Sequence, residues 1–471
     1  MNFSLLTTEI VTVCLAAFLV VMDLITPDKE SRRGLGYMAL LGLLGIFGHT
    51  FTQYGVNASL YKGLYVIDNY AVFFKQIFLA AAILAVLFSL DFVDTLPRHR
   101  GEYYSLVVFA TTGMMVMASA NDLLTLFVGM ELMAITFYIL VGYLLGNARS
   151  SEAGLKYMIL GAASTAILLY GISLIYGYTG AVGLPDIVAR IAVTPAVLVG
   201  MVLIIVGFSF KIAAVPFHMW SPDIYEGAPV PITALLAMAS KAAGFAVLIR
   251  VLVTAFPALQ KDWVILLAVL SAGSMIIGNL LAMPQRNVKR LLAYSSIAQA
   301  GYLLTGVIAA NQAGVKGVLF YSLLYVFANA GAFCVVAAVH NASGSDDMDA
   351  YNGLAQRSPF LAAVMTVALL SMAGIPPLAG FAGKFYLFSA VVEQGYLWLA
   401  LLGFVMSMIS VYYYLLVTKA MYLHTSVDNL PVAVSQPLGL AAMVSLILTI
   451  FFGVYPGPLA NLATIAAKSL F

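Results

Sequence analysis

Apolar runs of about twenty residues recur from one end of the chain to the other, and a run of this length, wound as an α-helix, spans the hydrocarbon layer of a bilayer. Only 9% of the 471 residues are charged and 63% are hydrophobic, whereas a soluble domain carries roughly 25% charged residues. A transmembrane β-barrel would alternate apolar and polar residues over short segments, and no segment of this sequence does so. The sequence therefore predicts an all-α polytopic membrane protein.

About fourteen membrane-spanning helices of the usual length are predicted, within one membrane domain over residues 1–471. The expected spans are about 5–26, 34–54, 69–91, 103–119, 122–145, 153–178, 195–217, 229–254, 262–283, 290–310, 314–341, 358–390, 395–423 and 436–456. Cytoplasmic loops are enriched in lysine and arginine. Because Arg98, Arg100 and Arg149 follow odd-numbered spans, we expect the odd loops in the cytoplasm and both termini on the outer side of a bacterial inner membrane.

Three short motifs recur in order at an offset of 159 or 160 residues. They are GYLLG at Gly142 and GYLLTG at Gly301, AGLK at Ala153 and AGVK at Ala313, and AAVPF around Pro216 and AGIPP around Pro376. The pattern predicts two five-helix repeats, 103–254 and 262–423, after three N-terminal helices in 1–102 and before a last helix at 436–456. An odd number of spans per repeat turns the second copy upside down, which is an architecture of secondary transporters.

Four ionisable residues lie near the middle of otherwise apolar spans, where each would cost at least about 2.5–3.5 kcal/mol if it faced lipid. They are Glu131, Lys211, Lys241 and Lys384. Such residues are kept where they face a bundle interior, a partner charge or water, and they mark ion pathways. A purely structural role as ion pairs is the alternative. Lys75, Lys156 and Lys316 lie near span ends, where we expect lysine side chains to reach for the membrane surface.

Prolines interrupt two of the spans that carry these lysines. Proline has no N–H, so Pro216, Pro376 and Pro377 free the carbonyls of the residues four positions earlier. Those residues are Ile212, Met372 and Ala373. Irregular backbone at membrane depth is tolerated where it lines a wet or protein-buried cavity. The helix breaks therefore indicate that Lys211 and Lys384 are sites that take up and release protons.

His218 follows Pro216 by two residues and has two interpretations, which the sequence leaves open. It caps or pairs within the loop, or it relays protons to cytoplasmic water.

Several other chemistries find no support in the sequence. GLGYMA at Gly34 fits a dinucleotide-binding pattern, but it opens an apolar span with no strand before it. We find no P-loop, haem motif or metal-ligand cluster, and no basic patch for nucleic acid. We expect no cofactor and no metal on this chain, and no nucleic-acid partner.

Three long segments resemble the antiporter-like membrane subunits of respiratory complex I. They are NDLLTLFVGMELMAITFYILVGY from Asn121, KIAAVPFHMWSPDIYEGAPVPITALLAMASKAAGF from Lys211 and GIPPLAGFAGKFYLF from Gly374. The resemblance covers essentially the whole chain. Lysine at position 384, the modest length and the expected lack of a lateral helix after Phe452 are similar to the subunit N branch of that family. Its larger members typically carry glutamate at this position.

The resemblance implies a proton-translocating subunit that couples quinone reduction to proton pumping. It implies a charge pair between Glu131 and Lys211, a central relay at Lys241, and a terminal station toward the outside at Lys384. Lys156 is then a secondary modulator.

The resemblance also implies which molecules surround this chain. Its partners would be the antiporter-like subunit M, small membrane subunits such as K and J, lipids and protons. FMN, iron–sulfur clusters and quinone would be carried by other subunits, with no redox active site on this chain.

Three alternatives share the fold. They are an Mrp-type cation/proton antiporter subunit, a membrane hydrogenase subunit and a structural scaffold with vestigial charges. A sodium site would need clustered carboxylates and carbonyls in mid-membrane, and Glu131 is the one carboxylate that the sequence offers there.

Overall fold

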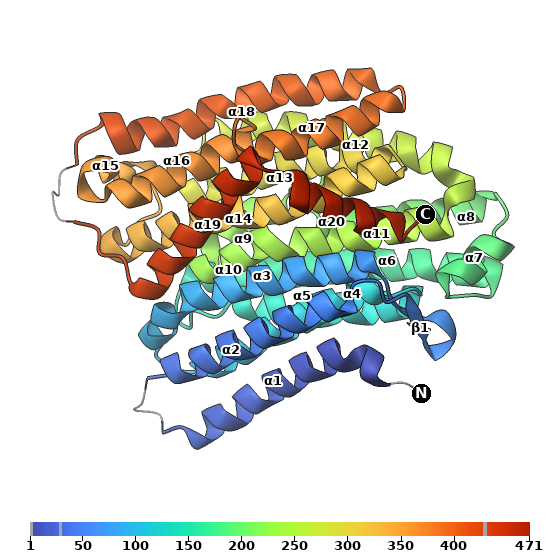
Figure 1. The fold of residues 1–471 in the computed structure, drawn as a ribbon, viewed down its shortest axis with the longest axis horizontal. Coiled ribbons are helices and arrows are strands. Elements are labelled where there is room, and N and C mark those ends of the chain that lie inside the picture. Colours follow the sequence, from blue (N-terminus) through green and yellow to red (C-terminus); the bar gives the residue numbers. More distant parts are fainter. Residues whose placement is uncertain (1–2, 28–30, 427–430) are drawn as a thin grey trace.

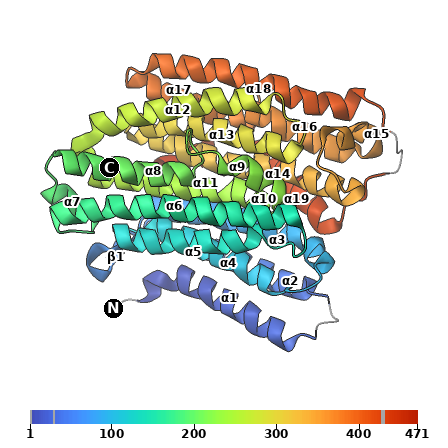
Figure 2. The same ribbon diagram turned by 180° about the vertical axis from the view of Figure 1, so that it is seen from behind.

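The computed structural model describes residues 3–27, 31–426 and 431–471. Most of this part of the chain is helical, and the helices lie side by side along one direction (Figure 1). Helix α1 (Thr7–Ile25) lies at one edge of the array and α18 (Leu397–Leu423) at the opposite edge, as the view from behind also shows (Figure 2). The two-stranded antiparallel hairpin of β1 (Ala58–Leu60) and β2 (Tyr65–Ile67) is the one sheet among the described residues.

Thirteen further long helices follow one another along the described part of the chain. They are α2 (Arg33–Thr50), α3 (Asn69–Phe92), α4 (Glu102–Ser119), α5 (Leu123–Val141), α6 (Ala148–Thr179), α8 (Pro195–Lys211), α11 (Lys241–Ala255), α12 (Gln260–Ala282), α13 (Val288–Ile308), α14 (Gln312–Ser343), α16 (Pro359–Ala373), α17 (Ala379–Glu393) and α19 (Gln436–Val454). The shorter ones are α7 (Leu184–Arg190), α9 (Trp220–Gly227), α10 (Val230–Leu235), α15 (Leu354–Arg357) and α20 (Gly457–Lys468).

Eleven helices among the described residues are long and apolar enough to cross a membrane. The apolar helices α8 and α16 are shorter. Helices α3, α13 and α14 and the α10–α11 segment are almost entirely buried, whereas only 28% of the residues in the apolar windows of α1 and α19 are buried. The chain is therefore a multi-pass membrane protein with its core around α3, α11, α13 and α14. The count of fourteen spans remains a prediction, because length and composition alone do not define it.

Both proline-containing segments separate two helices. Helix α8 ends at Lys211 and α9 begins at Trp220, so Pro216 lies in the irregular segment between them. Helix α16 ends at Ala373 and α17 begins at Ala379, so the span expected at 358–390 is two helices. Gly374 closes α16 with a φ of +87°, a conformation that glycine adopts without steric cost.

A π-helical turn at Leu236–Ser240 joins α10 to α11 and ends directly before Lys241. Such turns are rare, and they are frequent at functional sites. Sequence reasoning missed this one, because no proline or glycine lies within the turn itself.

The helix expected to be the last, 436–456, is followed by another. Helix α20 (Gly457–Lys468) lies beyond α19 and packs against α3 and α14 (Figure 1). The sequence did not predict this helix, which has 12 residues; the expected lack of a lateral helix after Phe452 stays a prediction. The Tyr70 backbone N–H, in the first turn of α3, donates to Ser469 Oγ at 3.0 Å. The chain's last described residues thus secure the start of a core helix.

Lys75 does not reach the membrane surface, and that expectation is wrong. Its side chain is fully buried on α3, and its Nζ lies 2.7 Å from Glu9 Oε1 on α1. The aromatic ring of Tyr65 lies 5.6 Å from the same Nζ. A lysine one and a half turns into a helix is close enough to the helix end to snorkel. Here a buried carboxylate from the neighbouring helix binds it instead.

Replacing Glu9 by glutamine is expected to weaken the packing of α1 on α3 by about 3–5 kcal/mol, because it leaves a buried ammonium without its counter-charge. A lower thermal midpoint of the solubilised protein checks this. Glu102→Gln is the matched control, since Glu102 pairs with His99 at an exposed site. The two variants having equal midpoints would contradict the prediction.

Candidate functional site

Three lysines are buried at interruptions of the helical backbone. Lys211 is the last residue of α8, Lys241 follows the π-helical turn, and Lys384 lies in α17 after the second break. Their exposed fractions are 2%, 3% and 4%. None of the three forms an ion pair with a carboxylate among the residues that the structure describes. A buried cation without a counter-ion is costly, so this arrangement calls for an explanation other than stability.

The ammonium group of Lys384 is held by a freed backbone carbonyl. Its Nζ donates to Ala373 O at 3.2 Å and to Ser407 Oγ at 2.7 Å. The Ser407 hydroxyl donates to the same carbonyl at 2.7 Å. The Tyr302 ring centroid lies 4.3 Å from the ammonium, where the face of the ring favours a cation. Ala373 is one of the residues whose carbonyl the prolines were expected to free.

A largely apolar cleft of about 430 Å³ adjoins Lys384. It is lined by residues of α16, α17 and α18, including Pro376, Ser407 and the exposed side chains of Phe385 and Met408. A Cβ at Gly374 would lie 3.0 Å from the Lys384 side chain. Glycine at this position therefore provides both the left-handed turn and the room for the lysine.

Lys241 has a different environment. Its Nζ donates to Ser296 Oγ of α13 at 2.5 Å, and the ring of Tyr225 lies 5.8 Å away. Ser296 in turn donates to the Ala293 carbonyl on its own helix at 2.7 Å. The central lysine thus joins α11 to α13 through one hydroxyl.

Glu131 and Lys211 do not form the direct charge pair that the family resemblance implies. The half-buried Glu131 carboxylate of α5 accepts a hydrogen bond from Thr165 Oγ1 of α6 at 2.8 Å. Lys211 Nζ has no hydrogen-bond partner in the described part of the chain. The two side chains therefore make no contact with each other in the described structure.

The irregular segment after Lys211 is held by side chains from other helices. The Val215 N–H donates to Ser274 Oγ of α12 at 2.9 Å, and Trp220 Nε1 donates to the Phe210 carbonyl at 2.9 Å. His218 lies between the break and α9 and is 8% exposed. This placement is compatible with both interpretations of His218, and neither is decided.

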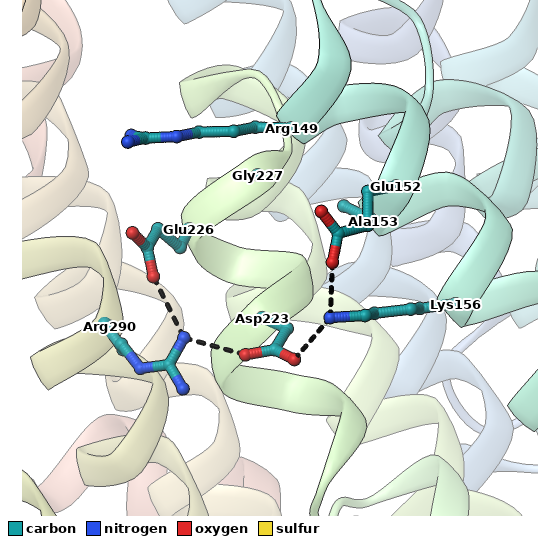
Figure 3. Close-up of a pocket in the computed structure, with 8 residues that line it drawn as sticks. All are labelled: Arg149, Glu152, Ala153, Lys156, Asp223, Glu226, Gly227 and Arg290. Carbon is teal, nitrogen blue, oxygen red and sulfur yellow. Dashed lines mark hydrogen bonds and ion pairs between the residues drawn. The ribbon is translucent and has the colours of Figure 1, made fainter.

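Lys156 belongs to a network of charges at one end of the bundle (Figure 3). Its Nζ lies 2.7 Å from Glu152 and 3.0 Å from Asp223, and Arg290 bridges Asp223 at 2.7 Å to Glu226 at 2.9 Å. The network joins α6, α9 and α13 around a pocket of about 210 Å³. The Lys156 side chain is 43% exposed, in contrast to the three buried lysines.

Sequence reasoning missed the neutral groups that hold the lysines. These are Ser296, Tyr302 and Ser407. It also missed Gln299 of α13, whose Nε2 donates to the Met372 carbonyl at 3.0 Å. Met372 is another residue whose carbonyl was expected to be freed. Ser295 and Ser296 precede Gln299 by four and three residues, which places each of them beside Gln299 on the helix surface. That spacing was the available signal.

A multi-pass helical bundle with lysines buried at broken helices defines the class of antiporter-like membrane proteins. Residues 120–410 match the family described as NADH:quinone oxidoreductase/Mrp antiporter, TM. The chain belongs to this family, and within it to the NADH-quinone oxidoreductase subunit N proteins.

The similarity extends over whole chains. The subunit N of Heliobacterium modesticaldum is 59% identical over 473 residues, which covers 100% of both chains. That of Desulforamulus reducens is 51% identical, covering 99% of this chain and 98% of the relative. A chain in respiratory complex I from Thermus thermophilus is 33% identical with a TM-score of 0.84, covering 97% of this chain and 99% of that one. A chain of the Mrp complex from Dietzia sp. shares the fold, with a TM-score of 0.88 at 21% identity, covering 100% and 98%.

Proposed function

We propose that this chain is a proton-translocating, antiporter-like subunit in the membrane arm of complex I, where it couples electron transfer to quinone with proton movement. The observation that carries the proposal is the set of three buried lysines without ion pairs, each at an interruption of a helix. The subunit N relatives supply the enzyme context. The flavin, iron–sulfur clusters and quinone of such a complex are assigned to other subunits.

Each lysine has a separate role in this proposal. Glu131 and Lys211 form a switch in which the carboxylate's field controls the lysine's proton. Lys241 is the central relay, and Lys384 delivers the proton toward the outside. Lysine can take up and release a proton in such a site, whereas arginine remains charged. Lys156 and His218 are secondary candidates on the path between the central lysines and cytoplasmic water.

The internal symmetry of the helices supports two inverted repeats, 103–254 and 262–423, within about fourteen spans of ordinary length. Helices α6 and α14 both have 32 residues. Each begins after an asparagine cap, Asn147 or Asn311, and each ends at a left-handed glycine, Gly180 or Gly344. With both termini on the outer side of a bacterial inner membrane, the charged network of Lys156 faces the cytoplasm.

The partners we propose are the antiporter-like subunit M, small membrane subunits such as K and J, and lipids against the exposed apolar side chains. An Mrp-type or hydrogenase-type assembly remains the second candidate, because the Dietzia chain shares the fold. Native mass analysis of gently solubilised membranes separates them. Co-migration with flavin and iron–sulfur subunits supports complex I, and an assembly with Mrp subunits alone contradicts it.

The proposal is tested by comparing Lys384→Ala with Lys384→Glu in the assembled complex. Alanine should abolish most proton pumping, because a positioned acid–base group contributes roughly 10²–10⁴-fold to proton transfer. Glutamate should retain part of it, since a protonated carboxyl can donate to the Ala373 carbonyl in place of the ammonium. Dye-monitored acidification of inverted vesicles measures the rate. Normal pumping by Lys384→Ala would overturn the proposed function.

A further inference from the structure

Side chains of helix α13 form hydrogen bonds both with Lys241 and with groups near the helix break that precedes Lys384. Ser296 accepts from Lys241 Nζ at 2.5 Å. Its neighbour Ser295 shares a short hydrogen bond with the Tyr414 hydroxyl of α18. One turn further, Gln299 Nε2 lies 3.5 Å from the same hydroxyl. Helix α13 thus contacts Lys241 through Ser296, and it contacts groups near the second helix break through Ser295 and Gln299.

Gln299 uses both ends of its amide. Its Nε2 donates to the Met372 carbonyl at 3.0 Å, and its Oε1 accepts from the Tyr321 hydroxyl of α14. The side chain is 1% exposed. A glutamine can serve as donor and acceptor at once, and here it joins three helices, α13, α14 and α16, at one point.

The terminal lysine and this glutamine hold neighbouring carbonyls of the same helix end. Lys384 donates to Ala373 O and Gln299 donates to Met372 O. Both carbonyls belong to the last turn of α16, directly before the break. An ammonium donates more strongly than a neutral amine does, so the hold on Ala373 changes with the protonation of Lys384. Met372 is covalently linked to Ala373, and Gln299 therefore senses that change.

Three polar side chains bind one another directly in this region, those of Ser295, Gln299 and Tyr414. A connected hydrogen-bond network of this kind has few alternative arrangements, so it can fix the positions of the polar groups between Lys241 and Lys384.

We propose that Gln299 is a positioning residue that couples the last turn of α16, and through it Lys384, to the hydroxyls on the Lys241 side. It carries no proton itself. Its amide fixes the hydroxyls of Tyr414 and Tyr321 relative to the last turn of α16. Proton exchange between Lys241 and Lys384 therefore depends on the conformation of that turn. This inference rests on the proposed proton-translocating function.

The experiment compares Gln299→Leu, Gln299→His and the control Asn329→Leu in the assembled, reconstituted complex. Asn329 is an equally buried amide on α14, and its Nδ2 donates only within its own helix, to Tyr325 O at 2.8 Å. Leucine removes all three hydrogen bonds of the Gln299 amide, while neutral histidine keeps one donor and one acceptor. Proton pumping is measured per assembled complex, beside quinone reductase activity and beside Lys384→Ala.

We expect Gln299→Leu to lower the pumping rate about tenfold, the usual scale for losing a buried hydrogen-bond partner. Gln299→His should recover most of that loss, and Asn329→Leu should pump normally. Equal defects in the leucine and histidine variants would overturn the inference, because packing alone would then explain them. If Gln299→Leu fails to assemble, Tyr321→Phe decides, and normal pumping there overturns the inference.

The test also separates this inference from the proposed function. Normal pumping by Gln299→Leu beside a defective Lys384→Ala removes the role of Gln299 and leaves the proton pathway in place. Normal pumping by both variants removes the proposed function, and the inference with it.

Discussion

Lys241→Ala is expected to reduce proton pumping by the assembled complex about a hundredfold, within the range for losing a positioned acid–base group. Lys241 is fully buried, and its Nζ has a hydroxyl rather than a carboxylate as its hydrogen-bond partner. Lys241→Arg should be almost as defective, because arginine keeps its charge but does not release the proton. Acidification of inverted vesicles on addition of the electron donor measures the rate.

Lys316→Ala is the matched control for this experiment. Lys316 is also a helical lysine beside an aromatic ring, with its Nζ 4.6 Å from the Tyr386 ring centroid, but it is only half-buried on α14. Its variant should pump at nearly the normal rate. If Lys241→Arg pumps normally, Lys241 contributes charge only, and the relay role is wrong.

The second large effect is expected for Glu131 and Lys211. Glu131→Gln and Lys211→Ala should each lower coupled activity strongly, because the carboxylate's field and the lysine's proton belong to one equilibrium. Glu131→Asp should keep a substantial part of the activity by preserving the charge at shorter reach. In the structure Glu131 is bound by Thr165 and not by Lys211, so we expect this coupling to act through space.

A double-mutant cycle measures that coupling directly. The combined variant should be less defective than the sum of the single variants by at least about 0.5 kcal/mol, the lower bound for coupled residues. Thr165→Val provides a comparison that removes the hydrogen bond to Glu131 and leaves its charge. Defects of Glu131→Gln and Lys211→Ala that simply add would show that the two residues act independently.

The positions of the buried lysines and of both helix breaks could be predicted from the sequence. Apolar periodicity defines a membrane helix without tertiary information, and proline removes one backbone donor wherever it lies. The freed carbonyls of Met372 and Ala373 follow from the same argument, and the structure shows what binds them: Gln299 and Lys384.

The partners of the charged groups could not be predicted, because they come from helices far apart in the sequence. Glu9 of α1 binds Lys75 of α3, and Ser296 of α13 binds Lys241, which lies 55 residues earlier in the sequence. The π-helical turn before Lys241 also depends on packing rather than on local propensity. Helix α20 was missed because a short amphipathic segment lacks the long apolar run that marks a span.

The hydrogen bond between Ser469 and Tyr70 has a consequence for biosynthesis. The first turn of α3 is made early, yet its partner is added 399 residues later. At roughly 5–20 residues per second, the start of this core helix waits about 20–80 s for that contact. Helices α19 and α20 also cover α14 only after α18 has been made. The centre of the bundle is therefore closed by its C-terminal helices, and a ribosome that stalls just before residue 457 leaves uncovered the parts of α3 and α14 against which α20 packs.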